Sequence, residues 1–195
     1  MSEKPVPEKK EDRRVRRTKK LLTQSLTELL QTKQINEITV KELTERADMN
    51  RGTFYQYYKD VYDMLEKIED SMFGALDNIV SMHSDDSNGQ TRAFFLDLFT
   101  FISENRDMCR VLLSPHGDMN FLHKLNTVLR ERCLEIRPEF LGSGSDVDFE
   151  YQYNFVIFGC AGLIRTWVSR DCQEPAEQLA DMADNMLHHG IIDKE

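Results

Sequence analysis

The stretch ITVKELTERADMNRGTFYQYYKDVYDML, residues 38–65, decides the fold of this chain. It predicts two short helices joined by a tight turn and followed by a third helix. Thr39 can cap the first helix, and Glu42 three residues later completes a capping-box pattern. Leu43 and Ala47 lie four residues apart and give that helix one apolar stripe. This order of elements is typical of a helix-turn-helix unit.

The second helix of this unit is unusually polar. Asn50 can cap it, and we expect it to run from Arg51 to about Tyr58. Three tyrosines share it with arginine, threonine and glutamine. A helix buried in a core has little use for so many hydroxyls and amides, whereas a helix laid against phosphates and base edges does. We expect Phe54 and Tyr58 to pack inward.

The residues of this block resemble the N-terminal domain of the tetracycline-repressor (TetR/AcrR) family of bacterial regulators. The matching positions form one ungapped run: Ile38, Thr39, Val40, Leu43, Ala47, Gly52, Thr53, Phe54, Tyr55, Tyr58, Asp63 and Leu65. The close match covers about the first third of the chain. The resemblance implies an all-α fold of about nine helices, with a three-helix DNA-binding head and a helical dimerisation and ligand domain. Two positions depart from the family pattern, because Asp48 replaces the turn glycine and Val61 replaces a phosphate-binding lysine, for which Lys59 can substitute.

Charge is divided unevenly along the chain. Residues 1–60 hold fourteen Lys and Arg against ten Asp and Glu, whereas residues 61–195 hold eleven against twenty-four. A basic segment on an acidic protein indicates a DNA-binding end, although a solvated basic tail has the same composition. We therefore expect a disordered arm over residues 1–12, a helix-turn-helix domain over 13–60 and a helical regulatory and dimerisation domain over 61–195.

Other features of the composition point away from membrane proteins and enzymes. No apolar run reaches the length of about 18 residues that a membrane helix needs, and the N-terminus has no signal-peptide core. Four widely spaced cysteines without a CxxC pair are expected to be reduced and structural in a cytoplasmic protein, with redox sensing as the alternative. We find no phosphate loop, HExxH or GxSxG motif, and the five histidines are scattered. The sequence thus predicts no metal, no cofactor and no enzymatic activity.

The twelve residues that we expect at the DNA interface lie in three segments. Arg51 and Gln56 have the chemistry to read guanine and adenine edges. The resemblance puts Thr53 and Tyr55 at phosphate-contact positions and Tyr57 at a DNA-facing aromatic position. The full set is Arg17, Thr18, Thr39, Lys41, Asn50, Arg51, Gly52, Thr53, Tyr55, Gln56, Tyr57 and Lys59.

Helical periodicity continues through the rest of the chain. We expect helices over residues 13–33, 61–82, 90–105, 106–113, 117–137, 146–170 and 175–188. Their apolar residues predict either a filled core or a pocket for a small-molecule effector, which family members commonly bind. The candidate lining is Met72, Leu76, Phe95, Phe99, Leu125, Leu129, Phe155 and Phe158.

A dimer face is predicted on the last two helices. Two glycines on one stripe of the helix over 146–170 indicate a close helix contact, either inside the chain or with a second copy. The resemblance favours the second copy, because family members form a four-helix bundle. The candidate face is Phe158, Gly159, Gly162, Leu163, Thr166, Leu179, Met182 and Met186. A two-fold homodimer suits a palindromic double-stranded operator.

The sequence leaves the mode of control open. The leading hypothesis is a repressor that a small molecule releases from its operator. Residues 94–113 and 151–168 resemble a Gram-positive subgroup of regulators found near dihydroxyacetone kinase, in which some members are activators with a protein co-sensor. A protein co-regulator is therefore the alternative to a metabolite.

Overall fold

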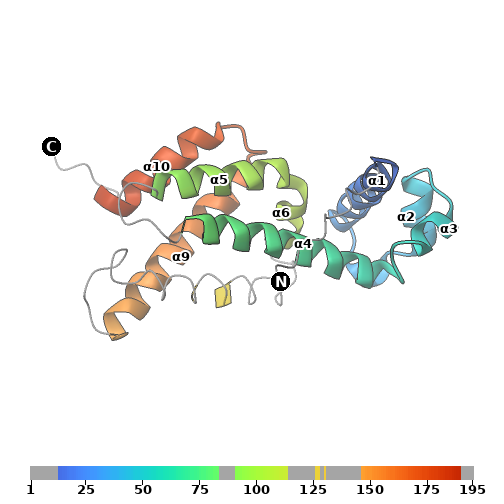
Figure 1. Ribbon diagram of the computed structural model, residues 1–195, viewed down its shortest axis with the longest axis horizontal. Coiled ribbons are helices and arrows are strands. Elements are labelled where there is room, and N and C mark those ends of the chain that lie inside the picture. The colour runs from blue at the N-terminus through green and yellow to red at the C-terminus, as the bar shows by residue number, and fades with distance from the viewer. Residues whose placement is uncertain (1–12, 84–90, 114–125, 128–129, 131–145, 190–195) are drawn as a thin grey trace, which may run out of the picture. The chain divides into compact units, whose positions relative to one another are not determined.

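The computed structural model describes residues 13–83, 91–113, 126–127, 130 and 146–189 (Figure 1). Within these ranges the chain forms eight α-helices, one 3-10 helix and no strand, which confirms the all-α prediction. The elements, labelled as in Figure 1, are α1 (Arg13–Leu30), η1 (Ile35–Glu37), α2 (Val40–Arg46), α3 (Arg51–Tyr55), α4 (Val61–Met82), α5 (Thr91–Glu104), α6 (Arg106–Leu112), α9 (Asp146–Ser169) and α10 (Ala176–His189). The arm expected over 1–12, and nearly all of the helix expected over 117–137, lie outside the described residues.

The chain divides into two compact units, Met1–Ile68 and Glu69–Glu195, here called the head and the body. We expected the division after residue 60. It falls later because the first turns of α4 carry apolar side chains into the core of the head. Val61 is 5% exposed there and Met64 is fully buried.

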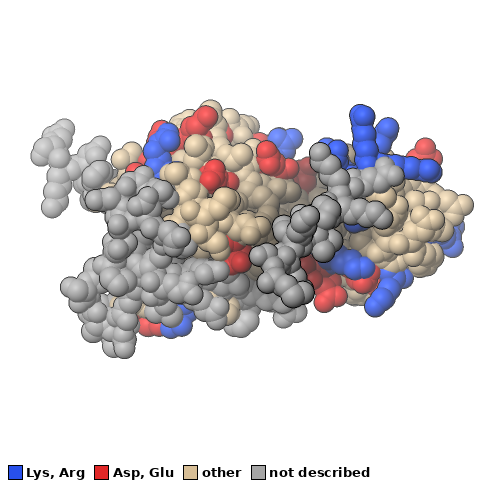
Figure 2. Space-filling view, in the orientation of Figure 1, with Lys and Arg blue, Asp and Glu red and all other residues tan. Residues whose placement is uncertain are grey.

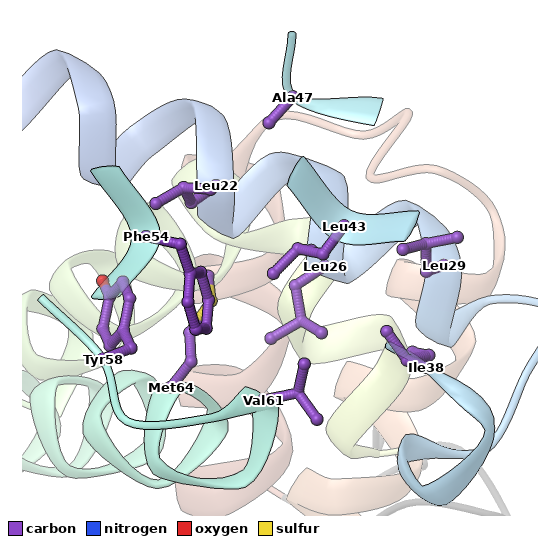
Figure 3. Packing of buried hydrophobic residues seen from close by; sticks show 10 residues of the cluster. All are labelled: Leu22, Leu26, Leu29, Ile38, Leu43, Ala47, Phe54, Tyr58, Val61 and Met64. Carbon is purple, nitrogen blue, oxygen red and sulfur yellow. The ribbon is translucent and has the colours of Figure 1, made fainter. Parts of the chain in front are cut away.

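The core of the head forms where α1, α2, α3 and the start of α4 meet. Phe54 projects from α3 into the cluster, and its ring centroid lies 5.5 Å from that of Tyr58 (Figure 3). Burying a side chain as large as leucine or phenylalanine contributes about 1.5–3 kcal/mol. The cluster consists of Leu22, Leu26, Leu29, Ile38, Leu43, Ala47, Phe54, Tyr58, Val61 and Met64.

The turn between α2 and α3 is a Schellman motif. Met49 N–H donates to the Thr44 carbonyl at 2.9 Å, and Asp48 N–H donates to the Glu45 carbonyl at 3.2 Å. The motif requires a left-handed residue directly after the C-cap, and Asp48 occupies that place with φ of 52°. Since aspartate tolerates this region better than most residues, it can stand where glycine is usual.

The segment before α2 differs in detail from the prediction. Thr39 Oγ1 accepts the Glu42 N–H at 3.2 Å, as expected for the cap. The expected return bond from Glu42 is replaced, because its carboxylate pairs with Lys33 at 2.5 Å. A reciprocal capping box occurs instead one turn earlier, between Gln34 and Glu37 of η1.

The body is built around α5, which packs along α10 (Figure 1). An ion pair between Arg92 and Asp181 joins these two helices at 2.5 Å. Phe99 of α5 lies edge-on to the buried Trp167 of α9, with ring centroids 5.5 Å apart. The short α6 packs on α9, where Arg110 donates to the Val168 carbonyl. The aromatic side chains of α5 are thus largely core residues.

Candidate nucleic-acid interface

The helix α3 is shorter than the sequence predicted. It spans Arg51–Tyr55 rather than reaching Tyr58. The Phe54 carbonyl accepts N–H groups from both Tyr57 at 3.0 Å and Tyr58 at 3.1 Å, so the last turn tightens and closes the helix. Phe54 and Tyr58 still pack inward, as expected, because they lie four residues apart on one face.

None of the twelve residues expected at the interface is buried. The three half-buried ones are Thr18, Thr53 and Tyr57. The nine exposed ones are Arg17, Thr39, Lys41, Asn50, Arg51, Gly52, Tyr55, Gln56 and Lys59. Tyr55 is 58% exposed although it directly follows the fully buried Phe54. The aromatic side chains of this segment therefore divide into a set that holds the head together and a set presented on its surface.

Two of the residues expected at the interface also cap helices. Asn50 Oδ1 accepts the Gly52 N–H at 2.8 Å, and Thr39 caps α2 in the same way. These caps satisfy backbone donors that a helix start would otherwise leave open. They also fix where each helix starts, and so where the exposed side chains of the first turn point.

Positive charge in the head is concentrated on α1. Six of its first eight residues are Lys or Arg, and its first turn holds no acidic residue. Figure 2 shows Lys and Arg side chains gathered over this helix. Cations at a helix N-terminus oppose the helix dipole, so helix stability does not explain them, whereas a polyanionic partner does. Lys19 Nζ lies 6.0 Å from the centroid of the Tyr57 ring, which brings this basic helix next to the segment after α3.

A polar network at the start of α4 was not predicted from the sequence. Asp63 Oδ2 accepts both the Lys59 N–H and the ammonium of Lys67, each at 2.9 Å. These bonds, that from Lys67 above all, hold the pKa of the Asp63 carboxyl below its usual value. Lys67 also donates to the Tyr57 carbonyl at 3.1 Å. The spacing of Asp63 and Lys67, four residues apart on one helix, was the available signal.

The residues expected to line a pocket separate into three groups. Met72, Phe95 and Phe99 are buried and Leu76 is half-buried, and the stacked rings of Phe95 and Phe99 lie 6.0 Å apart. Leu125 and Leu129 lie outside the described residues. Phe155 and Phe158 are 75% and 72% exposed. Their place in a pocket is corrected, because they project from the outer face of α9.

The outer face of α9 carries most of the expected dimer contacts. Phe158, Gly159, Gly162 and Thr166 are exposed, and Leu163 is half-buried. A Cβ built on either glycine meets no atom of the described chain within 4 Å. The alternative of a packing groove inside the chain therefore has no support among these residues.

The expected contribution of α10 to that face needs one correction. Met182 and Met186 are partly exposed, as the prediction requires. Leu179, however, is only 4% exposed, because the apolar stripe of α10 that includes Ala180 and Ala183 packs within the body. Leu179 therefore stabilises the fold of a single chain and offers little surface to a second one.

The described cysteines fit a structural role. Burial raises the pKa of the Cys109 thiol to about 12 and that of Cys160 to about 11. A thiol with so high a pKa is almost wholly protonated near neutral pH and reacts slowly.

No helix among the described residues is long and apolar enough to cross a membrane. Nor do those residues group three His, Cys, Asp or Glu side chains in a way that suits a metal ion.

Comparison with known proteins agrees with this description. The TetR C-terminal family model described as "Transcriptional regulator C-terminal region" matches residues 90–189. The uncharacterized HTH-type transcriptional regulator YxbF of Bacillus subtilis is 26% identical over 99 residues, which cover 47% of this chain. That alignment spans only 25% of the length of YxbF.

Solved structures share the fold over most of the chain. FadR from Bacillus subtilis, in complex with stearoyl-CoA, superposes with a TM-score of 0.63 at 15% identity, covering 89% of this chain and 99% of that one. The dihydroxyacetone kinase operon activator DhaS gives a TM-score of 0.57 at 20% identity, covering 87% and 93%. At such low identity these likenesses establish the fold alone.

Proposed function

This chain belongs to the TetR family of transcriptional regulators, and from that membership we propose that it binds a palindromic operator as a homodimer under the control of a small molecule. The chain is thus a DNA-binding regulator rather than an enzyme, and we place its action in the cytoplasm. The observation that carries the DNA half of the proposal is the exposed face of α3. The helix α3 starts at the cap Asn50 and exposes Tyr55, and α1 supplies Lys and Arg side chains. These groups are donors of the kind that phosphates and base edges accept.

The twelve surface residues have different proposed roles. Arg51 and Gln56 read base edges from α3 and the turn that follows it. Thr53, Tyr55 and Tyr57 bind phosphates and fix the register, while Lys59 replaces the phosphate-binding lysine whose position Val61 occupies. Val61 itself is buried in the head, which supports giving the contact to a neighbour.

The dimer half of the proposal rests on the outer face of α9. Exposed aromatic side chains at Tyr151, Phe155 and Phe158 continue the stripe that holds Gly159 and Gly162. Three large aromatic side chains, each more than 70% exposed, favour coverage by a partner surface. A second copy of the chain supplies that surface and sets two heads at half-sites about one DNA turn apart.

The effector is proposed to be apolar and to bind in the body. The neighbouring fold of FadR was solved with stearoyl-CoA, which makes a long-chain acyl thioester the first compound to test. Apolar side chains of α4 and α5, such as Met72 and Phe95, are buried at the site where we expected a pocket. The effector would act by favouring one of two conformations that differ in operator affinity.

A protein co-regulator is the second candidate for control. The fold similarity to DhaS, described as an operon activator, favours this alternative. A large exposed apolar patch on the body beyond the dimer face would favour this alternative. The two candidates differ in what changes operator affinity, either a metabolite or a second protein.

The proposal is tested by selecting DNA from a random-sequence duplex pool with the purified full chain. We expect enrichment of one palindromic sequence, bound by two chains in sedimentation equilibrium. Addition of a long-chain acyl-CoA should then lower the affinity for the selected duplex, whereas free coenzyme A should not. A pool without enrichment at low salt refutes sequence-specific binding by the protein alone.

A further inference from the structure

The segment between α3 and α4 has few backbone bonds of its own. Beyond Tyr58 the chain leaves the helix, and α4 starts at Val61 with Asp60 as its cap, since Asp60 Oδ1 accepts the Asp63 N–H at 2.8 Å. Three of the proposed DNA contacts, Gln56, Tyr57 and Lys59, lie in or next to this segment. Their position on the surface therefore depends on whatever fixes residues 56–60.

Lys67 supplies much of that fixation from the second turn of α4. Its ammonium donates to the Tyr57 carbonyl at 3.1 Å and to Asp63 Oδ2 at 2.9 Å. It also lies 5.5 Å from the centroid of the Tyr58 ring, within the range of a cation–π contact. An ammonium has three donors, and two of those of Lys67 are engaged by acceptors of the head, although its side chain is 51% exposed.

Asp63 completes the connection on the other side. Its carboxylate accepts the Lys59 N–H as well as the Lys67 ammonium, and its side chain is only 16% exposed. Aspartate four residues before lysine is the favourable order on a helix. Lys67 and Asp63 together thus hold the backbone at Tyr57 and at Lys59, on either side of the buried Tyr58.

We propose that Lys67 is a positioning residue for operator recognition: it binds no phosphate, and it holds residues 57–59 in the conformation that reads DNA. The proposal rests on the DNA-binding function proposed above. It adds a residue of α4 to the recognition apparatus. It also separates two lysines that sequence reasoning would treat alike. Both side chains are exposed, but the Lys67 ammonium donates to the Tyr57 carbonyl and to Asp63.

The test compares Lys67→Gln with Lys59→Gln as the matched control. The probes are the duplex selected by the wild-type chain and a random duplex of the same length, each titrated at several salt concentrations. Lys67→Gln should weaken binding to the selected duplex roughly tenfold, the effect of losing one charge-assisted hydrogen bond. Its affinity for random DNA and its salt dependence should stay close to those of the wild type.

Lys59→Gln should behave differently. If the Lys59 ammonium binds phosphate, this substitution weakens binding to both duplexes. It also reduces the slope of log affinity against log salt by about 1. Asp63→Asn should reproduce the Lys67→Gln phenotype, and the double variant should be no worse than either single variant, because both changes break one network. If Lys67→Gln lowers the salt slope as Lys59→Gln does, Lys67 is a phosphate contact and the proposal is overturned.

A measurement without DNA keeps the two proposals apart. In the free protein, Lys67→Gln should speed hydrogen exchange of the Lys59 amide while leaving that of the Gly52 amide, which Asn50 holds, unchanged. Unchanged exchange at Lys59 overturns the positioning role even if the chain binds DNA. Faster exchange at Lys59 in a chain that selects no duplex supports the conformational role and refutes the proposed function instead.

Discussion

Replacing Asn50 separates the stability of α3 from its proposed contact with DNA. Asn50 Oδ1 accepts the Gly52 N–H at 2.8 Å at the start of a helix of only five residues. Removing such a cap costs about 1 kcal/mol, which is about a fivefold change in the ratio of folded to unfolded protein. Asn50→Ala should therefore lower the free energy of unfolding by about that amount.

Asn50→Asp should have the opposite balance of effects. The carboxylate keeps the acceptor, and the dipole at the helix start favours its charge by about 0.3–1 kcal/mol, so stability should equal or exceed that of the wild type. The same charge faces phosphates if α3 lies against DNA. A repulsion of about 1 kcal/mol, the value for two unit charges 4 Å apart in water, weakens binding about fivefold.

The assay pairs urea denaturation, followed by circular dichroism, with fluorescence anisotropy on the selected duplex. Equal losses of stability in the two variants would show that the Asn50 side chain is not a cap. Undiminished DNA binding by a stable Asn50→Asp variant would show that the start of α3 does not face DNA, and the interface would have to be moved.

Three further predictions concern other parts of the chain. Phe158→Asp should turn the dimer into a folded monomer in sedimentation analysis, whereas Thr100→Asp, at an exposed position of α5 outside the candidate face, should not. A Phe158→Asp variant that stays dimeric would remove this face from the interface. Asp48→Ala should lower the free energy of unfolding by about 1 kcal/mol, because alanine tolerates a φ of 52° poorly. An unchanged midpoint of urea denaturation would argue against strain at this turn. A hydrogen bond from Arg46 lowers the pKa of the Glu28 carboxyl. The stability that this bond contributes is therefore present above the unfolded pKa of about 4.3, and it is lost as the pH falls through the lower folded pKa. The stability difference between wild type and Glu28→Gln should therefore vanish in strong acid, and a difference independent of pH would contradict this linkage.

Local signals in the sequence predicted the helix-turn-helix well. Caps at Thr39 and Asn50 and the left-handed residue Asp48 depend on side chains and backbone within a few residues of one another, so their effects can be worked out from neighbours alone. The bounds of α4 were also predicted correctly, from Val61 to Met82. The separation of inward and outward tyrosines followed from helical spacing in the same way.

Predictions that depended on distant contacts were less accurate. Periodicity assigned Phe155 to a pocket and Leu179 to a dimer face, because an apolar stripe looks the same whichever surface it meets. The fold exposes the first and buries the second. The sequence likewise put the domain boundary before Val61, since nothing local shows that the first turns of α4 pack into the head.

The network around Lys67 shows where these two kinds of information meet. Its ion pair with Asp63 is local, and helical spacing alone predicts it. Its bond to the Tyr57 carbonyl spans ten residues and requires the path of the chain between α3 and α4. A surface ion pair alone contributes little to stability, about 0.3–0.5 kcal/mol. The pair of Lys67 with Asp63 by itself therefore gives no reason to expect a role in DNA binding. The bond to Tyr57 does give such a reason, because it links α4 to the backbone that carries three of the proposed DNA contacts. Sequence changes at Lys67 should therefore alter operator discrimination more than stability.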